Sequence, residues 1–173
     1  RREVVLEFNE PFRGQGQVVD AKTSLPIPGA SIQILTHLDG KRLEKRGSVW
    51  LANEEGRFAI EGLSSRGNPI DVSAQGYAIR TAFGVGLSGR TIEFGVVPLY
   101  PKQSLEIQLI GHGQEEWTSF LCELSGTTTF ADRHFSSAGR LEYEGLSPGS
   151  YVARVVYPGQ RTYRDVTVLL NPG

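Results

Sequence analysis

The stretch GRFAIEGL at residues 56–63 recurs 83 residues later as GRLEYEGL at residues 139–146. In both copies large apolar residues alternate with charged residues or alanine, which is the pattern of a strand with one buried face. A glycine and a leucine close each stretch. The same offset carries VSAQG at residues 72–76 onto VVYPG at residues 155–159. Two matches at one offset predict two copies of one β-structured module.

Alternation of the same kind runs through the rest of the chain. It occurs around residues 4–8, 30–34, 70–74, 92–96, 105–109, 151–157 and 166–170. With 21 glycines and 9 prolines among 173 residues, turns are frequent and long helices have little room. The predicted fold class is all-β, with two tandem Ig-like antiparallel β-sandwiches.

One segment allows two interpretations. The apolar residues between Trp117 and Leu124 have helical spacing, and Gly126 follows them as a plausible helix C-cap. The same stretch, residues 114–125, also fits a strand that buries Phe120, Cys122 and Leu124. We favour the strand, because the repeat places a strand there.

The composition excludes several classes of protein. A net charge of −1 argues against a dedicated nucleic-acid or membrane-surface binder. Cys122 is the single cysteine, which excludes an intrachain disulfide framework and a cysteine-only metal cluster. No apolar run approaches the ~20 residues of a membrane span, and no cofactor or metal is predicted. The chain lacks methionine and begins Arg1-Arg2-Glu3, which we interpret as a processed product or a piece of a longer protein.

Prolines at positions 98 and 101 predict a stiff boundary between the two modules. We therefore expect residues 12–99 to form the first sandwich and residues 100–173 to form a second, divergent one. REVVLEFN at residues 2–9 resembles RDVTVLLN at residues 164–171, where the second module would have its closing strand. Residues 1–11 are thus expected to be the closing strand of a preceding repeat or a strand that docks on the first module.

Four motifs of the first module resemble those of the carboxypeptidase regulatory-like domain: GQVVD at 16–20, PIPGASI at 26–32, NEEGRF at 53–58 and AQGY at 74–77. The resemblance covers residues 12–98, whereas the second module matches mainly over residues 139–157 and lacks the P-x-x-G-A turn. It implies a transthyretin-like β-sandwich that serves as an accessory module in many bacterial extracellular and envelope proteins. Such a resemblance indicates the fold more than the function.

The candidates for general acid/base chemistry are the carboxylates of the repeat, namely Glu54, Glu55, Glu61, Glu142 and Glu144. The alternation that buries Phe58 and Ile60 places Arg57 and Glu61 on the solvent face, and the second copy has the same pattern. We interpret these charges as cross-strand pairs. The three histidines, His37, His112 and His134, show no metal-ligand or catalytic spacing and are interpreted as surface residues.

Single residues argue against three further kinds of chemistry. Cys122 has apolar neighbours on its face of the strand and no nearby histidine, so we expect a buried, inert thiol. Related transthyretin-like hydrolases of purine breakdown end in a Tyr-Arg-Gly-Ser signature, which Tyr163-Arg164-Asp165 breaks. A self-made isopeptide bond, as in collagen-adhesin repeats, needs a buried acid where this chain has Ala153 and Val155. The sequence therefore predicts no enzymatic activity.

The candidate binding residues fall into three groups. The alternating Val4, Leu6 and Phe8 are expected to pair with a neighbouring domain or chain. The basic cluster Lys41, Arg42, Lys45 and Arg46 is expected in a solvated hairpin loop, where it could attract an acidic protein surface, a polyanionic glycan or a lipid headgroup. Trp50 and Trp117 are the aromatic residues that could stack on a glycan.

The predicted function is that of a non-catalytic structural and protein-interaction module, a spacer or docking domain. Its expected location is extracytoplasmic, in the periplasm, at the cell surface or secreted, within a larger bacterial protein or envelope assembly. The expected partners are other protein domains or subunits, bound through edge strands or loops. The alternative is a carbohydrate-binding accessory module that uses exposed aromatic residues.

Overall fold

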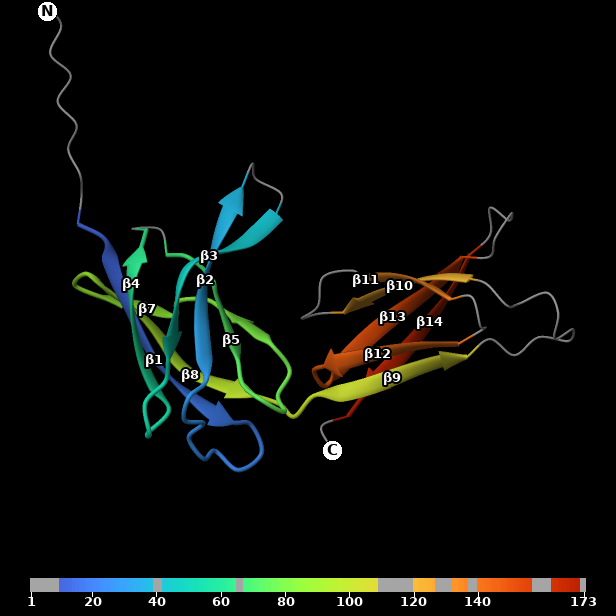
Figure 1. Ribbon diagram of the computed structural model, residues 1–173, viewed down its shortest axis with the longest axis horizontal. Coiled ribbons are helices and arrows are strands. Elements are labelled where there is room, and N and C mark those ends of the chain that lie inside the picture. Colours follow the sequence, from blue (N-terminus) through green and yellow to red (C-terminus); the bar gives the residue numbers. More distant parts are fainter. Residues whose placement is uncertain are drawn as a thin grey trace, which may run out of the picture. The chain divides into compact units, whose positions relative to one another are not determined.

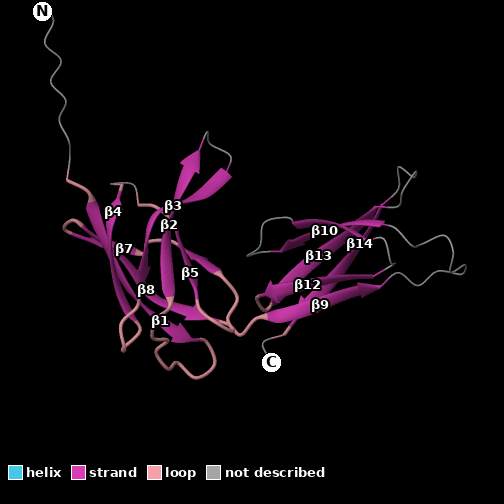
Figure 2. Ribbon diagram, in the orientation of Figure 1, coloured by secondary structure: helices cyan, strands magenta, loops and turns pink. Residues whose placement is uncertain are grey.

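The computed structural model describes residues 10–38, 42–64, 67–108, 120–126, 132–136, 140–156 and 163–171. This part of the chain is all-β, with fourteen strands and no helix (Figures 1 and 2), which confirms the predicted fold class. The strands are β1 (Phe12–Asp20), β2 (Ser31–Leu38), β3 (Arg42–Leu51), β4 (Arg57–Leu63), β5 (Ile70–Ser73), β6 (Arg80–Ala82), β7 (Gly86–Ser88), β8 (Thr91–Leu99), β9 (Gln103–Gln108), β10 (Phe120–Gly126), β11 (Asp132–Ser136), β12 (Arg140–Leu146), β13 (Gly149–Val156) and β14 (Tyr163–Leu170). Among these residues no helix is long and apolar enough to span a bilayer.

The chain divides into two compact units. The first comprises Arg1–Gln75 and Arg80–Leu99, and the second comprises Gly76–Ile79 and Tyr100–Gly173. The strand expected within residues 1–11 lies outside the described residues, except for the last two positions, which precede β1.

Two four-stranded sheets form the first unit, with the strand orders β4-β1-β8-β7 and β3-β2-β5-β6. Strands of both sheets contribute completely buried aliphatic side chains to one core, including those of Val18, Ile32, Ile60, Val72 and Leu99. Because every second residue of these strands points inward, the alternation in the sequence becomes a sandwich core.

One ladder of the first unit departs from the expected antiparallel pattern. β4 pairs antiparallel with β1, but β8 lies along the other edge of β1 in parallel, from Arg13 beside Thr91 to Asp20 beside Leu99. On its other side β8 pairs antiparallel with β7. The first sandwich is therefore mixed, with a parallel ladder inside one sheet.

Two glycines in β1 allow large core side chains to lie directly against the strand. A Cβ on Gly14 would be 2.7 Å from Cδ1 of Leu63 and 2.8 Å from Cε2 of Phe94, and one on Gly16 would be 2.7 Å from Cζ of Phe58. The rings of Phe58 and Phe94, with centroids 6.1 Å apart, occupy this space. Some of the glycine content thus serves core packing rather than turns.

The second unit has a four-stranded sheet, β11-β10-β13-β14, and a two-stranded sheet, β12-β9. Its buried core contains Cys122, Leu124, Tyr143, Leu146, Tyr151, Ala153 and Val155. The hydroxyl of Tyr143 donates a hydrogen bond of 3.0 Å to the carbonyl of Cys122, so this buried polar group is satisfied. Strand β10 confirms the strand interpretation over residues 120–125, and residues 114–119 lie outside the described part.

The 83-residue repeat is visible in the fold. β4 and β12 begin and end at corresponding residues, and a buried leucine closes each of them. The glycine before that leucine has a positive φ in both units, 88° at Gly62 and 75° at Gly145. The order β3-β2-β5-β6 corresponds strand for strand to β11-β10-β13-β14, and β4-β1 corresponds to β12-β9. β7 and β8 have no counterpart in the described part of the second unit.

Candidate functional site

The structure describes some of the binding residues expected from the sequence. Val4, Leu6, Phe8, Lys41 and Trp117 lie outside the described residues. Arg42, Lys45 and Arg46 belong to β3 and pair with β2, so the expectation that they lie in a hairpin loop is wrong. The ladder between β2 and β3 continues to Leu38, whereas β2 pairs with β5 only over residues 31–34. Arg42, Lys45 and Arg46 therefore lie on a two-stranded extension of the sheet.

Trp50 does not present the exposed ring that stacking on a sugar requires. It lies opposite Ile32, which is completely buried, and is itself partly buried. Val49 and Leu51, on the other face of β3, are exposed. Trp50 does point opposite to its neighbours, as expected, but it occupies the inner face.

A groove of about 640 Å³ lies over β1, β4 and β8. Its polar side chains include those of Gln15 and Glu93, and Nε2 of Gln15 donates a hydrogen bond of 2.8 Å to Oε1 of Glu93. The aromatic residue in its lining, Phe58, is buried. The groove thus offers no ring face to a sugar and does not favour the carbohydrate alternative.

The charged residues of the repeat lie on the solvent side, as the alternation predicts. Arg13 and Glu61 on paired strands form an ion pair of 3.5 Å, and Arg140 forms one of 2.5 Å with Glu106. Exposed pairs of this kind contribute at most ~1 kcal/mol each. They are cross-strand surface pairs rather than an acid/base pair.

Cys122 is buried in the core of the second unit. Burial raises the pKa of its thiol, and a hydrogen bond with Tyr143 offsets part of that increase. A thiol that stays protonated at neutral pH is a poor nucleophile. The described core around it contains Ala153 and Val155 and no acidic side chain. Among the described residues, no three potential metal ligands come together.

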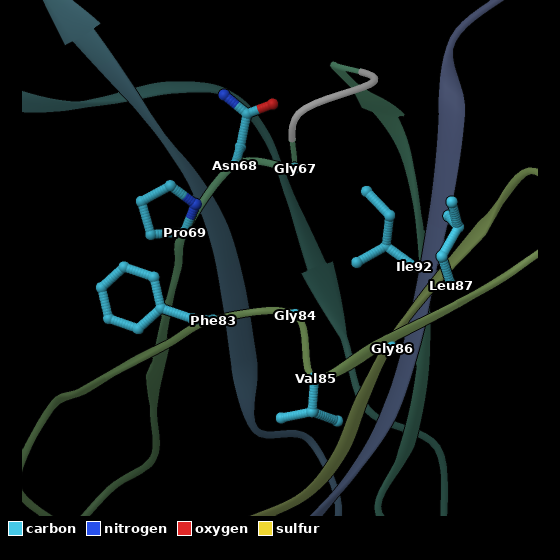
Figure 3. Close-up of a pocket in the computed structure, with 9 residues that line it drawn as sticks. All are labelled: Gly67, Asn68, Pro69, Phe83, Gly84, Val85, Gly86, Leu87 and Ile92. Atoms are coloured by element: carbon cyan, nitrogen blue, oxygen red, sulfur yellow. The ribbon is translucent and has the colours of Figure 1, made fainter.

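A pocket of about 420 Å³ lies on the first unit, where the chain passes from β6 in one sheet to β7 in the other. It is lined by Gly67, Asn68, Pro69, Phe83, Gly84, Val85, Gly86, Leu87 and Ile92. Figure 3 shows Phe83 and Pro69 at one end of the pocket and Leu87 and Ile92 at the other. Three of its side chains are unusually exposed for apolar residues: Phe83 at 65%, Val85 at 76% and Leu87 at 61%.

Backbone constraints hold the walls of this pocket in place. A Cβ on Gly84 would be 2.4 Å from Cγ2 of Ile92, so only glycine lets the chain pass this close to β8. The amide of Val85 donates a hydrogen bond of 2.6 Å to the carbonyl of Glu93. Asn68 anchors the opposite wall, because its Oδ1 accepts from the amide of Ser64 at 2.8 Å and its Nδ2 donates to a carbonyl of β2 at 3.3 Å.

The chemistry of this pocket is that of an apolar binding surface. Its lining contains no titratable side chain, and Asn68, its one polar side chain, already makes hydrogen bonds. It can bind apolar groups but cannot move a proton or attack an electrophile. β7, at its rim, pairs on one side with β8 and is the last strand of its described sheet.

The sequence pattern alone does not indicate this site. Phe83, Val85 and Leu87 do alternate with small residues, which is a strand signal. Alternation alone, however, does not show that the apolar side chains remain exposed. In the structure Leu87 belongs to β7, the last strand of its described sheet, and Phe83 and Val85 lie in the segment that leads into it.

No family model and no curated protein matches the chain. Among solved structures, it is similar to the Bacillus anthracis TIE protein, with 12% identity over 94% of this chain and 32% of that one and a TM-score of 0.38. The streptococcal ancillary pilin has 12% identity over 92% of this chain and 59% of that one, with a TM-score of 0.39. A 9R-lipoxygenase from Cyanothece PCC8801 has 17% identity over 67% of this chain and 21% of that one, with a TM-score of 0.38. The chain thus spans between about a fifth and three fifths of these proteins, and similarities this low transfer no function to it.

Proposed function

We propose that this chain is a non-catalytic structural and protein-interaction module of a larger extracytoplasmic bacterial protein or envelope assembly. In this proposal its two units are the tandem sandwiches expected for residues 12–99 and 100–173. Its partner is an extended apolar segment of a neighbouring domain or subunit, which pairs with β7 and inserts side chains into the pocket beside Phe83 and Leu87.

The observation that carries this proposal is the combination of exposed apolar side chains with an edge strand. Apolar residues at the rim of a pocket gain free energy when a partner covers them, at roughly 25 cal/mol per Å². An edge strand offers backbone groups that a partner strand can pair with. The absence of titratable groups from the pocket lining supports binding rather than catalysis.

The test is a titration of isotopically labelled protein with a pool of synthetic ten-residue peptides of alternating apolar and polar residues. We expect NMR shifts confined to residues 67–69 and 83–92. Leu87→Asp should abolish these shifts, because it places a charge in the pocket. Leu25→Asp is the matched control, since Leu25 is 64% exposed but does not line the pocket.

A second arm of the same titration uses soluble oligosaccharides of β-glucan and of peptidoglycan. Shifts at Gln15 and Glu93 with sugars, and none with peptides, would contradict the proposal and establish the carbohydrate alternative. Peptide-induced shifts that survive Leu87→Asp would also contradict it.

A further inference from the structure

The two units differ at one place in the sandwich. In the first unit β8 lies along the edge of β1 that β4 leaves open. The counterpart of β1 is β9, because Gly14 pairs with Ile60, Leu105 pairs with Tyr143, and residues 60 and 143 are 83 apart. In the described part of the second unit the sheet ends at β9. The edge of β9 opposite β12 therefore has no partner strand there.

The side chains around this place are apolar and incompletely covered. Leu105 and Ile107 pack against the core but are only half-buried. Val166 of β14 pairs with the buried Ala153, yet it is 51% exposed. At the corresponding place in the first unit, Ala82 of β6 is 9% exposed. A strand in the position of β8 would cover these groups.

We propose that β9 accepts a parallel strand from a second copy of this chain, formed by residues 3–8. This edge is separate from β7, and the inference does not depend on the function proposed there. Leu6-Glu7-Phe8 matches Ile92-Glu93-Phe94 of β8 in residue type. In β8, Ile92 and Phe94 are buried, and Glu93 bonds to Gln15 on the outer face. Residues 3–8 thus carry the side chains that this position requires, and their six residues equal the length of β9.

A second copy is the occupant because the equivalent place in the first unit is filled. β1 is paired on both edges, with β4 and with β8. Glu10, which follows the donor segment, is fixed to its own first unit by Arg90, through an ion pair of 3.3 Å and a hydrogen bond to its carbonyl. Binding of this segment to the second unit of another copy is a head-to-tail contact, which repeats from copy to copy.

The register makes a specific prediction about charge. In the first unit Ile92 lies beside Gly14 and Glu93 beside Gln15. The same register places Leu6 beside Leu105 and Glu7 beside Glu106. Arg140, 2.5 Å from Glu106, offsets part of the repulsion between these carboxylates. Neighbouring like charges on paired strands weaken pairing, so Glu7→Gln should strengthen the association.

Sedimentation velocity over a range of concentrations measures this association in the full chain. We expect concentration-dependent assembly, with a Kd raised about tenfold or more by Leu6→Asp, because that charge would be buried against Leu105. Glu7→Gln should lower the Kd about two- to fivefold. Val5→Ser is the control, since Val5 would lie on the outer face. A peptide of residues 1–10 in excess should dissociate the assembly, and circular dichroism of each variant verifies that the fold is kept.

A chain that stays monomeric at every concentration would overturn the proposal. This outcome includes the case in which residues 3–8 pair with β9 of their own copy. Assembly that Leu6→Asp and the peptide leave unchanged would overturn it as well.

Discussion

The two units share a repeat but differ in completeness. The first has two sheets of four strands, whereas the second has a four-stranded sheet facing a two-stranded one in its described part. Strands common to both occupy corresponding positions, down to the positive φ of Gly62 and Gly145. Leu105 and Ile107 of β9 and Val166 of β14 remain partly exposed, whereas Ala82, the counterpart of Val166 in the first unit, is buried. The repeat therefore specifies the strands common to both units, and the described difference between the units is the added pair β7 and β8.

The largest expected effect comes from the leucines that close β4 and β12. Leu63→Ala and Leu146→Ala should each lower the free energy of unfolding of their own unit by about 2–5 kcal/mol, because both leave a cavity in a core. Leu63 should show the larger loss, since its own sheet has four strands, whereas Leu146 lies in a described sheet of only two. Urea unfolding followed by the amide NMR signals of β4 for the first unit and of β12 for the second measures both. A larger loss for Leu146→Ala would contradict the comparison.

The next effect concerns one equivalent position, which is occupied by Gly14 in the first unit and by Leu105 in the second. Gly14→Ala should destabilise the first unit by about 1–3 kcal/mol through overpacking, because its Cβ would lie 2.7 Å from Leu63 and 2.8 Å from Phe94. Leu105→Ala in the second unit removes a half-buried side chain and should cost less. Matched urea titrations compare the two variants. Tolerance of Gly14→Ala without loss would show that the core over β1 is loosely packed.

A smaller effect, equal in the two units, is expected at the glycine that precedes the closing leucine, Gly62 in the first unit and Gly145 in the second. Gly62→Ala and Gly145→Ala should each cost about 1–2 kcal/mol, because an L-residue is strained at positive φ. A Cβ would meet nothing within 4 Å at either glycine, so backbone strain is the only cost. Thermal unfolding of the two variants measures it. Clearly unequal losses would argue that the corner is not equivalent in the two units.

The smallest effect is electrostatic and distinguishes the equivalent edge strands β6 and β14. Nε and Nη2 of Arg154 donate to the two carboxylate oxygens of Asp165, each at 2.9 Å, whereas the first unit has a hydrogen bond of 2.7 Å from Thr81 to Asp71 at the equivalent ladder. The hydrogen bonds from Arg154 hold the pKa of Asp165 below its usual value, with a smaller contribution from the charge of Arg154 and a partial offset from desolvation. The stabilisation is therefore present above the unfolded pKa of ~3.9 and is lost as pH falls through the folded pKa.

Asp165→Asn should flatten this acid dependence in the second unit and change stability little at neutral pH. Unfolding titrations between neutral and acid pH check it. An unchanged acid dependence in the variant would show that the ion pair does not stabilise β14.

The strands common to both units were predictable from the sequence because their signal is local. Alternation around Phe58 and Ile60, with a glycine corner and a closing leucine, specifies β4, and the repeat extends the same interpretation to β12. The parallel position of β8 was not predictable, because it depends on pairing between residues as distant as Arg13 and Thr91. The glycines facing the core, Gly14 among them, look like turn residues until the rings that fill their space are known.

The candidate sites were predictable only in part. The burial of Cys122 and the surface position of Glu61 followed from alternation. The pocket beside Phe83 did not, because exposure depends on which strand ends a sheet. The inner position of Trp50 was not predictable either, for a different reason. Alternation shows that the two faces of a strand differ, but it does not show which face is buried.

Amide hydrogen exchange of β1 and β9 is the most direct test of the claim that the second sandwich is completed by a strand from another copy. The amides of β1 should be protected at every protein concentration, since both edges of β1 are paired. The amides of β9 that point away from β12 should exchange rapidly in dilute solution and slow down as concentration rises. Equal protection of these amides at all concentrations would contradict the account, because it would show that the edge of β9 is already covered within one chain.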